Sequence, residues 1–100
     1  MSYVPTYEVV ISEESPDGTY KLLFSVGIGS KVVEEAYAII EAGIPEAKKI
    51  DFQWGYNVDV YFDAEGFANF TNRHFRKYHN FFRDRIGDGK TYLLCVVDMS

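Results

Sequence analysis

The chain is 100 residues long, and 47% of its residues are hydrophobic, 17% aromatic and 25% charged. This size and composition are typical of one globular domain spanning residues 1–100, and they exclude an intrinsically disordered chain. The net charge of −5 argues against general binding to nucleic acids or anionic membranes, and no apolar run reaches the roughly 18 residues of a membrane span.

Two further features indicate the compartment. Residues 1–5 contain no basic segment followed by an apolar one, so we expect no secretory signal. The single cysteine, Cys95, excludes a disulfide within the chain and is typical of a reducing compartment. We therefore expect an intracellular, cytoplasmic protein.

The first half of the chain predicts a β-hairpin followed by a helix. Tyr7–Glu13 is rich in β-branched residues, and Ser15–Gly18 has the composition of a turn. Apolar residues alternate along Tyr20–Ile28, which predicts a half-buried strand. Ser30 has the side chain of an N-cap, apolar residues follow it at helical spacing, and Gly43 ends the predicted helix.

The second half predicts another hairpin, a long helix and a last strand. The hairpin strands are Ile50–Trp54 and Val58–Phe62, joined by a tight Gly-Tyr-Asn turn. Asp63 is the expected cap of a helix from Ala64 to Ile86, which a Gly-Asp-Gly sequence ends. The last strand, Thr91–Asp98, is apolar on both faces.

The order of these elements is ββαββαβ. Without the first strand it is the split βαβ, or ferredoxin-like, order, so we predict an α+β fold with a mainly antiparallel sheet and two helices on one face. The strand residues expected to pack under the helices are Leu22, Phe24, Val26, Ile50, Phe52, Trp54, Val58, Val60 and Phe62. Because the last strand has no polar face, we expect a second subunit to cover it, which predicts a homodimer.

The charge is distributed unevenly along the chain. Residues 1–65 hold 12 acidic and 4 basic side chains, whereas residues 66–100 hold 3 acidic and 6 basic ones. Five of the basic residues lie between Arg73 and Arg85, on the predicted long helix. They form either the solvated outer face of that helix or a surface that recognises an anion or an acidic partner.

The long helix also carries the residues best suited to chemistry. At about 100° per residue, its aromatic side chains share one face, with His74 within this stripe and His79 at its edge. Each histidine has two interpretations. It is either a core residue that donates to a buried acceptor, or a site residue that lines an aromatic pocket and acts as a neutral base.

The same residues do not predict a metal or a cofactor. His74 and His79 are five positions apart, unlike the four-residue spacing of a helical pair that shares one metal ion. Cys95 lies in an apolar strand and is expected to be an inert core thiol. The glycines of residues 27–29 lack the third glycine or the lysine of a phosphate-binding loop. We therefore predict no metal and no bound cofactor.

Two residues outside the long helix are further candidates. Asp98 follows the apolar run of the last strand, where it either orients a histidine by accepting its N–H or is solvated. Trp54 either continues the core-facing set of its strand or forms a wall on which a ligand stacks.

Three segments carry a family resemblance: Ile44–Gly55, with its Ile-Pro and Trp-Gly; Phe62–Phe67, followed by Phe70, His74 and His79; and Val97–Met99. Together they resemble the dimeric α+β barrel superfamily, most closely its stress-responsive barrel branch, which includes plant polyketide cyclases. The likeness extends from Val32 to Asp98.

The resemblance implies a small-molecule site in which His79, with His74, acts as acid and base and Asp98 orients them. The aromatic walls of that site would be Trp54, Phe70 and Tyr78. The chain also departs from the family. Phe70 stands where the family has a tyrosine, and the two histidines are spaced more widely than the family's pair.

Two functions from different classes follow. The first is a small dimeric domain that encloses an apolar or aromatic small molecule and, if it catalyses, is a cofactor-independent cyclase or acid–base catalyst. The second is a non-enzymatic module, an adaptor or an inhibitor, that binds a protein partner through a charged surface or a sheet edge. A pocket on the order of several hundred Å³ at His74 or His79 favours the first, and a solid core with packed or solvated imidazoles favours the second.

Overall fold

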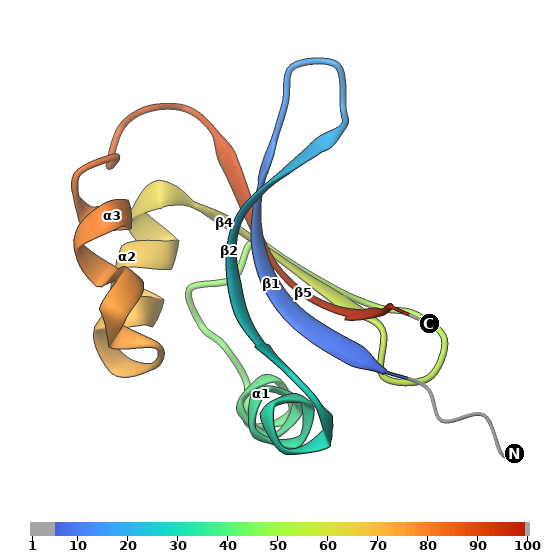
Figure 1. Ribbon diagram of the computed structural model, residues 1–100. Coiled ribbons are helices and arrows are strands. Elements are labelled where there is room, and N and C mark those ends of the chain that lie inside the picture. Colours follow the sequence, from blue (N-terminus) through green and yellow to red (C-terminus); the bar gives the residue numbers. More distant parts are fainter. Residues whose placement is uncertain (1–5, 100) are drawn as a thin grey trace, which may run out of the picture.

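A computed structural model describes residues 6–99 of the chain. The elements are β1 (Tyr7–Glu14), β2 (Tyr20–Ile28), α1 (Ser30–Ala42), β3 (Lys49–Phe52), β4 (Val58–Asp63), α2 (Ala64–Arg73), the 3₁₀ turn η1 (Arg76–Tyr78), α3 (His79–Arg83) and β5 (Thr91–Asp98). The strands form one antiparallel sheet, and the helices lie on one face of it (Figure 1). The predicted α+β class, antiparallel sheet and one-sided helices are confirmed.

The strand order is β2-β1-β5-β4-β3, which differs from the predicted ferredoxin-like order. In that order β2 and β4 would be parallel neighbours in the middle of the sheet. Here β1 and β5 lie between them and pair with each other, with Val10 opposite Cys95. Residues 9–12 and 92–94 are all buried, so the two strands that are apolar on both faces take the centre of the sheet. The first strand is therefore not an addition at the edge.

Two β-bulges in β2 change the face to which its side chains point. The pairing of β2 with β1 passes over Leu23 and Val26. Phe24 and Val26 consequently pack against the core, whereas Leu22 points to the opposite face and is 58% exposed. The prediction that Leu22 faces the core is wrong, because an alternating pattern does not reveal where an extra residue enters a strand.

The tip of the β3–β4 hairpin is exposed. β3 ends at Phe52, and Trp54 lies in the turn, where its carbonyl oxygen accepts hydrogen bonds from the backbone and side-chain N–H groups of Asn57 at 3.2 and 3.0 Å. Trp54 is 89% exposed, so the prediction that it packs under the helices is wrong. Phe52 does lie on the helix side of the sheet, where its ring centroid is 6.1 Å from that of Tyr37 of α1, but it is 54% exposed. The buried residues predicted correctly in this hairpin are Val58, Val60 and Phe62.

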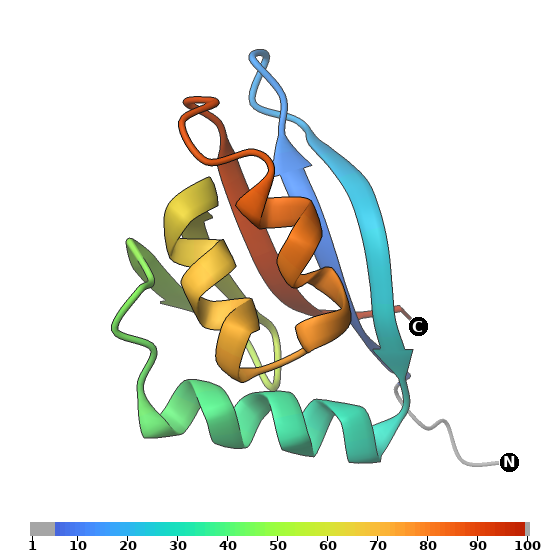
Figure 2. The ribbon, with the colours of Figure 1, turned by 90° about the vertical axis from the view of Figure 1, so that its left-hand side faces the viewer.

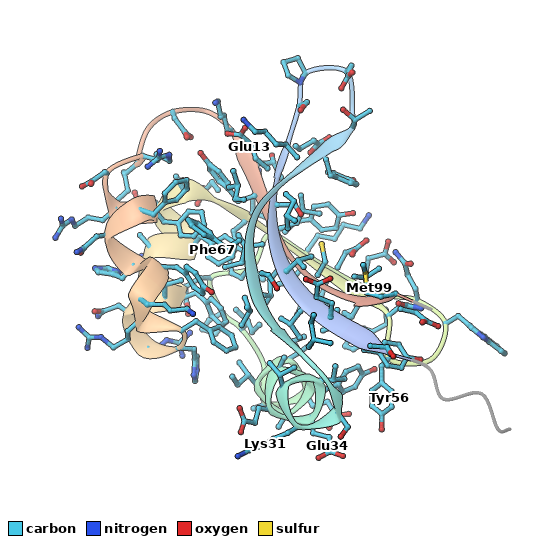
Figure 3. The ribbon with its side chains drawn as sticks, viewed as in Figure 1. Glu13, Lys31, Glu34, Tyr56, Phe67 and Met99 are labelled. Carbon is cyan, nitrogen blue, oxygen red and sulfur yellow. The ribbon has the colours of Figure 1, made fainter. Side chains whose placement is uncertain are left out.

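The predicted long helix is two helices. α2 ends at Arg73, His74 is extended, and Phe75 has a left-handed backbone with φ 56°. Figure 2 shows α3 folded back beside α2. No glycine or proline marks this break, and its physical reason is packing: both Phe67 of α2, labelled in Figure 3, and Phe82 of α3 are fully buried, with stacked rings whose centroids are 4.2 Å apart.

Candidate functional site

His79, at the start of α3, holds that helix against α2. Its Nδ1 lies 2.8 Å from the backbone carbonyl oxygen of Ala68, and the ring is partly buried. Because a carbonyl oxygen can only accept, Nδ1–H is the donor. In this arrangement that nitrogen is not available as a base. The contact corresponds to the interpretation of His79 as a packed histidine.

His74, Phe70 and Tyr78 lie in the same part of the molecule. The ring centroid of His74 is 5.4 Å from that of Phe70. Phe70 is fully buried, and Tyr78 is 5% exposed. The hydroxyl of Tyr78 donates to the carbonyl oxygen of Ser25 at 3.3 Å. Phe70 and Tyr78 therefore belong to the packed core that fastens α2 and η1 to the sheet.

Asp98 and Trp54 lie elsewhere. Asp98 ends β5 opposite Tyr7, and its backbone N–H donates to Oδ1 of Asn57 at 2.8 Å. This end of the sheet is well separated from α2 and α3 in Figure 1, so the fold does not bring Asp98 to the histidines. Trp54 lies in the turn before β4.

Three surface clefts have volumes of about 510, 460 and 310 Å³. The first lies between β1, the start of α1 and Tyr56, the second between the β1–β2 turn and the segment before β5, and the third beside the start of α2. None of the three is lined by His74, His79, Phe70 or Tyr78. The clefts and the histidines are thus in different places.

Three exposed aromatic side chains gather on the β3–β4 hairpin. Phe52 is 54%, Trp54 89% and Tyr56 47% exposed; these three residues are called the aromatic hairpin below. The ring of Tyr56 meets those of Tyr37 and Tyr7 edge-on, with centroids 5.3 and 5.7 Å apart. These contacts hold the tip of the hairpin against α1 and β1 while Trp54 remains in solvent.

The cleft of about 510 Å³ adjoins the aromatic hairpin. Tyr7, Tyr56 and Val33 give it apolar walls, and Glu34 adds a carboxylate to its lining. Figure 3 shows Tyr56 beside the part of α1 that carries Glu34. An apolar side chain or a small apolar molecule would find both contact area and a nearby negative charge here.

The sheet face away from the helices is partly covered by the chain itself. Tyr20 of β2 and Tyr61 of β4 are hydrogen-bonded across the two central strands, and this bond, together with burial, raises the pKa of Tyr61. The pair is called the tyrosine bridge below. Leu93 is fully buried and Ser12 is 7% exposed on the same face. The predicted second subunit is therefore not needed to cover Leu93.

Cys95 lies on that face, opposite Asp59 in the register. Burial, the negative charge of Asp59 and a hydrogen bond to it raise the pKa of the Cys95 thiol to about 12. Such a thiol stays protonated near neutral pH and is a poor nucleophile. This agrees with the expectation of an inert thiol, but Cys95 is partly exposed and is not a residue of the hydrophobic core as predicted.

Within residues 6–99, no group of three or more His, Cys, Asp or Glu side chains could hold a metal ion. No helix in this part of the chain is long and apolar enough to cross a membrane. Comparisons of the chain with protein-family models, with curated proteins and with solved structures found no match. The resemblance to the dimeric α+β barrel superfamily stays an expectation, and the observed strand order is not the one predicted alongside it.

Sequence reasoning missed the aromatic hairpin as a surface feature. Trp54 continues the alternation of Ile50 and Phe52, which indicates a buried position. The signal that could have found it is Gly55, which adopts φ 67° and lies in a tight turn. Trp54, directly before this glycine, is the first residue of the turn, because its carbonyl oxygen accepts the N–H of Asn57.

Proposed function

We propose that the chain is a non-enzymatic protein-binding module that docks a partner protein through the aromatic hairpin and the adjoining cleft. The observation that carries this proposal is the 89% exposure of Trp54 beside two further exposed rings. Burying such apolar surface against a partner is favourable, and tryptophan and tyrosine are enriched among the residues that dominate binding energies.

The cleft supports the same proposal. Interface residues that contribute most to affinity tend to fit into pockets on the partner. The walls formed by Tyr7, Tyr56 and Val33 would receive one apolar side chain of the partner while Trp54 packs beside it. The edge-on contacts of Tyr56 hold this wall in place before binding, which lowers the entropy cost of association.

A small apolar ligand in the same cleft is the second candidate. Its volume of about 510 Å³ lies within the roughly 300–1,000 Å³ of small-molecule sites. Tyr7 and Tyr56 would then contact the ligand in place of Phe70 and Tyr78. Acid–base catalysis by His79 has less support, because its Nδ1 donates to a backbone carbonyl and the cleft lies elsewhere.

A peptide selection tests the first candidate. A phage-displayed library of random dodecapeptides is selected on the wild-type protein, and the enriched peptides are titrated against the wild type and Trp54→Ser. We expect the variant to bind about tenfold more weakly or worse, with an unchanged melting temperature. Ile86→Ser is the matched control, because Ile86 is a 49% exposed apolar residue outside the hairpin.

Equal affinity of the enriched peptides for the wild type and Trp54→Ser would contradict docking through the aromatic hairpin. The fluorophore anilinonaphthalene sulfonate tests the second candidate. Binding that is lost in Tyr56→Ser and retained in Trp54→Ser would support a small-molecule site in the cleft.

A further inference from the structure

The sheet face that no helix covers is a second unoccupied surface. Figure 1 shows the sheet bent with the helices outside the bend, so this face is its inner, concave side. It is called the open face below. The register of the strands assigns to it Glu8, Val10, Ser12, Glu14, Tyr20, Leu22, Ser25, Ile28, Lys49, Asp51, Asp59, Tyr61, Asp63, Thr91, Leu93, Cys95 and Val97.

The open face is acidic. Apart from Asp63, whose carboxylate caps α2, it carries four carboxylates, those of Glu8, Glu14, Asp51 and Asp59, against one ammonium group, that of Lys49. Asp51 lies directly opposite Asp59, and like charges in such cross-strand pairs are destabilising. None of the four carboxylates takes part in an ion pair among residues 6–99. The fold thus tolerates a repulsion that a basic partner would relieve.

An apolar strip lies between these charges. Val10 is 9% exposed, and Cys95 and Val97 are partly exposed beside it. The tyrosine bridge lies at one end of the strip. It crosses over Ser12 and Leu93, which pair with each other two residues along from Val10 and Cys95. The β3–β4 turn lies at the other end of β4. The strip is therefore a short apolar surface with acidic side chains on both sides of it.

The edges of the sheet do not favour the addition of a partner strand. β2 contains two bulges, and β3 has four residues, with Lys49 at its start. Bulges, short edge strands and lysines are the features that block edge-to-edge pairing. A partner would accordingly lie on the face of the sheet and not along its edge.

We propose that the open face binds an amphipathic helix of a partner protein, with lysine or arginine side chains on both sides of an apolar stripe. The stripe would cover Val10, Cys95 and Val97, and the cations would meet Asp51 and Asp59. A two-fold dimer through this face would place the same carboxylates against each other, which opposes it. The inference shares a protein partner with the proposed function but uses a different surface.

The test uses the labelled peptide LKKLLKLLKKLLKL, a basic amphipathic helix, and its counterpart with glutamate in place of each lysine. Binding to the full chain is measured by fluorescence anisotropy at low and physiological salt. The double variant Asp51→Asn/Asp59→Asn should bind the basic peptide about fivefold more weakly and with a smaller salt dependence. Asparagine can still accept the hydrogen bond that Gln53 Nε2 donates to Asp59 at 2.9 Å, so the fold should persist.

The matched control is Glu35→Gln/Glu41→Gln, which removes the same charge from exposed positions of α1 on the other side of the sheet. It should bind within about twofold of the wild type. Equal weakening by the two double variants would overturn the proposal, because only net charge would then matter. Absence of binding to the wild type, or equal binding of the glutamate peptide, would also overturn it.

Two further outcomes separate this proposal from others. If Trp54→Ser no longer binds the basic peptide and the aspartate variant binds it as the wild type does, the peptide docks on the aromatic hairpin. This outcome would overturn the proposal for the open face. Sedimentation measures whether the chain forms dimers. If it does, and if the aspartate variant changes the dimer fraction while the control variant does not, the open face binds a second copy of the chain. This outcome too would overturn the proposal.

Discussion

The α2–α3 side and the β3–β4 hairpin use aromatic residues in opposite ways. On the first side, Phe67 and Phe82 are fully buried and His79 donates to a backbone carbonyl. The side chains that the sequence suggests for a catalytic site are therefore used in packing and in a structural hydrogen bond. On the hairpin, Trp54 is 89% exposed although its strand pattern indicates burial. The comparison teaches that residue type alone does not identify a site. What distinguishes one is side-chain surface or hydrogen-bonding capacity that the fold leaves unused.

The largest expected loss of stability comes from a substitution in the buried region between α2 and α3. Phe67→Ala should lower the free energy of unfolding by about 3–5 kcal/mol, because it removes a stacked ring and leaves a cavity. Trp54→Ala, the matched aromatic change on the hairpin, should change it by no more than about 0.5 kcal/mol. Urea denaturation at neutral pH measures both. Similar losses for the two variants would contradict the contrast between these regions.

A pH-dependent effect is expected at Cys95. Its thiol has a pKa of about 12 in the folded chain against 9.0 for the unperturbed group, so the unfolded state loses its proton first. The stabilising effect of the protonated thiol is complete below about pH 9 and is lost as the pH rises towards about 12, by at most about 1.4 kcal/mol per unit.

Urea denaturation of the wild type and Cys95→Ala at several pH values from about 8 to about 10 isolates this contribution. The difference in stability between the two proteins should change as the pH rises, with the wild type losing more. A difference that is independent of pH would show that the thiol is not shielded as described.

A smaller effect is expected at the contact between α3 and α2. His79→Ala should leave the chain folded and lower its stability by about 0.5–1.5 kcal/mol, the usual net value of one hydrogen bond. His74→Ala is the control, because it removes a ring that packs near Phe70. An unchanged stability of His79→Ala, measured by denaturation, would mean that the bond to Ala68 is not maintained in solution.

The smallest effect concerns the open face. Asp51→Asn should raise the stability by about 0.2–0.5 kcal/mol, because it removes the repulsion across the β3–β4 pair. Glu41→Gln, at an exposed position of α1, is the comparison and should have less effect. The melting temperatures of the two variants at low salt provide the measurement. A loss of stability in Asp51→Asn would indicate that this carboxylate is favourably paired.

The local structure is predicted well where it follows from the spacing of apolar residues along the chain. Alternation places Tyr20–Ile28 in a strand with the bounds observed for β2, and the spacing after Ser30 predicts α1. The period cannot show which strands are neighbours, so the central position of β1 is missed. It also cannot show the bulge that turns Leu22 to the other face, or the left-handed Phe75 that divides the helix. Tertiary packing determines both of these features.

The candidate site is predicted less well for a related reason. His74, His79 and Asp98 are chosen by chemical type, but their roles depend on contacts between elements far apart in the sequence. His79 meets Ala68 only because the chain reverses at Phe75. The sequence pattern predicts a continuous helix through this point, so neither the reversal nor the contact can be inferred from it.

The central pairing of β1 with β5 has a consequence for biosynthesis. These two strands come from opposite ends of the described chain, and the backbone N–H of Met99 donates to the carbonyl oxygen of Thr6 at 2.7 Å. Contacts of such long sequence separation form slowly, since the loop between them must close first. A nascent chain on the ribosome therefore cannot complete its sheet until β5 has emerged from the exit tunnel, and until then β1 lacks the neighbour that buries it.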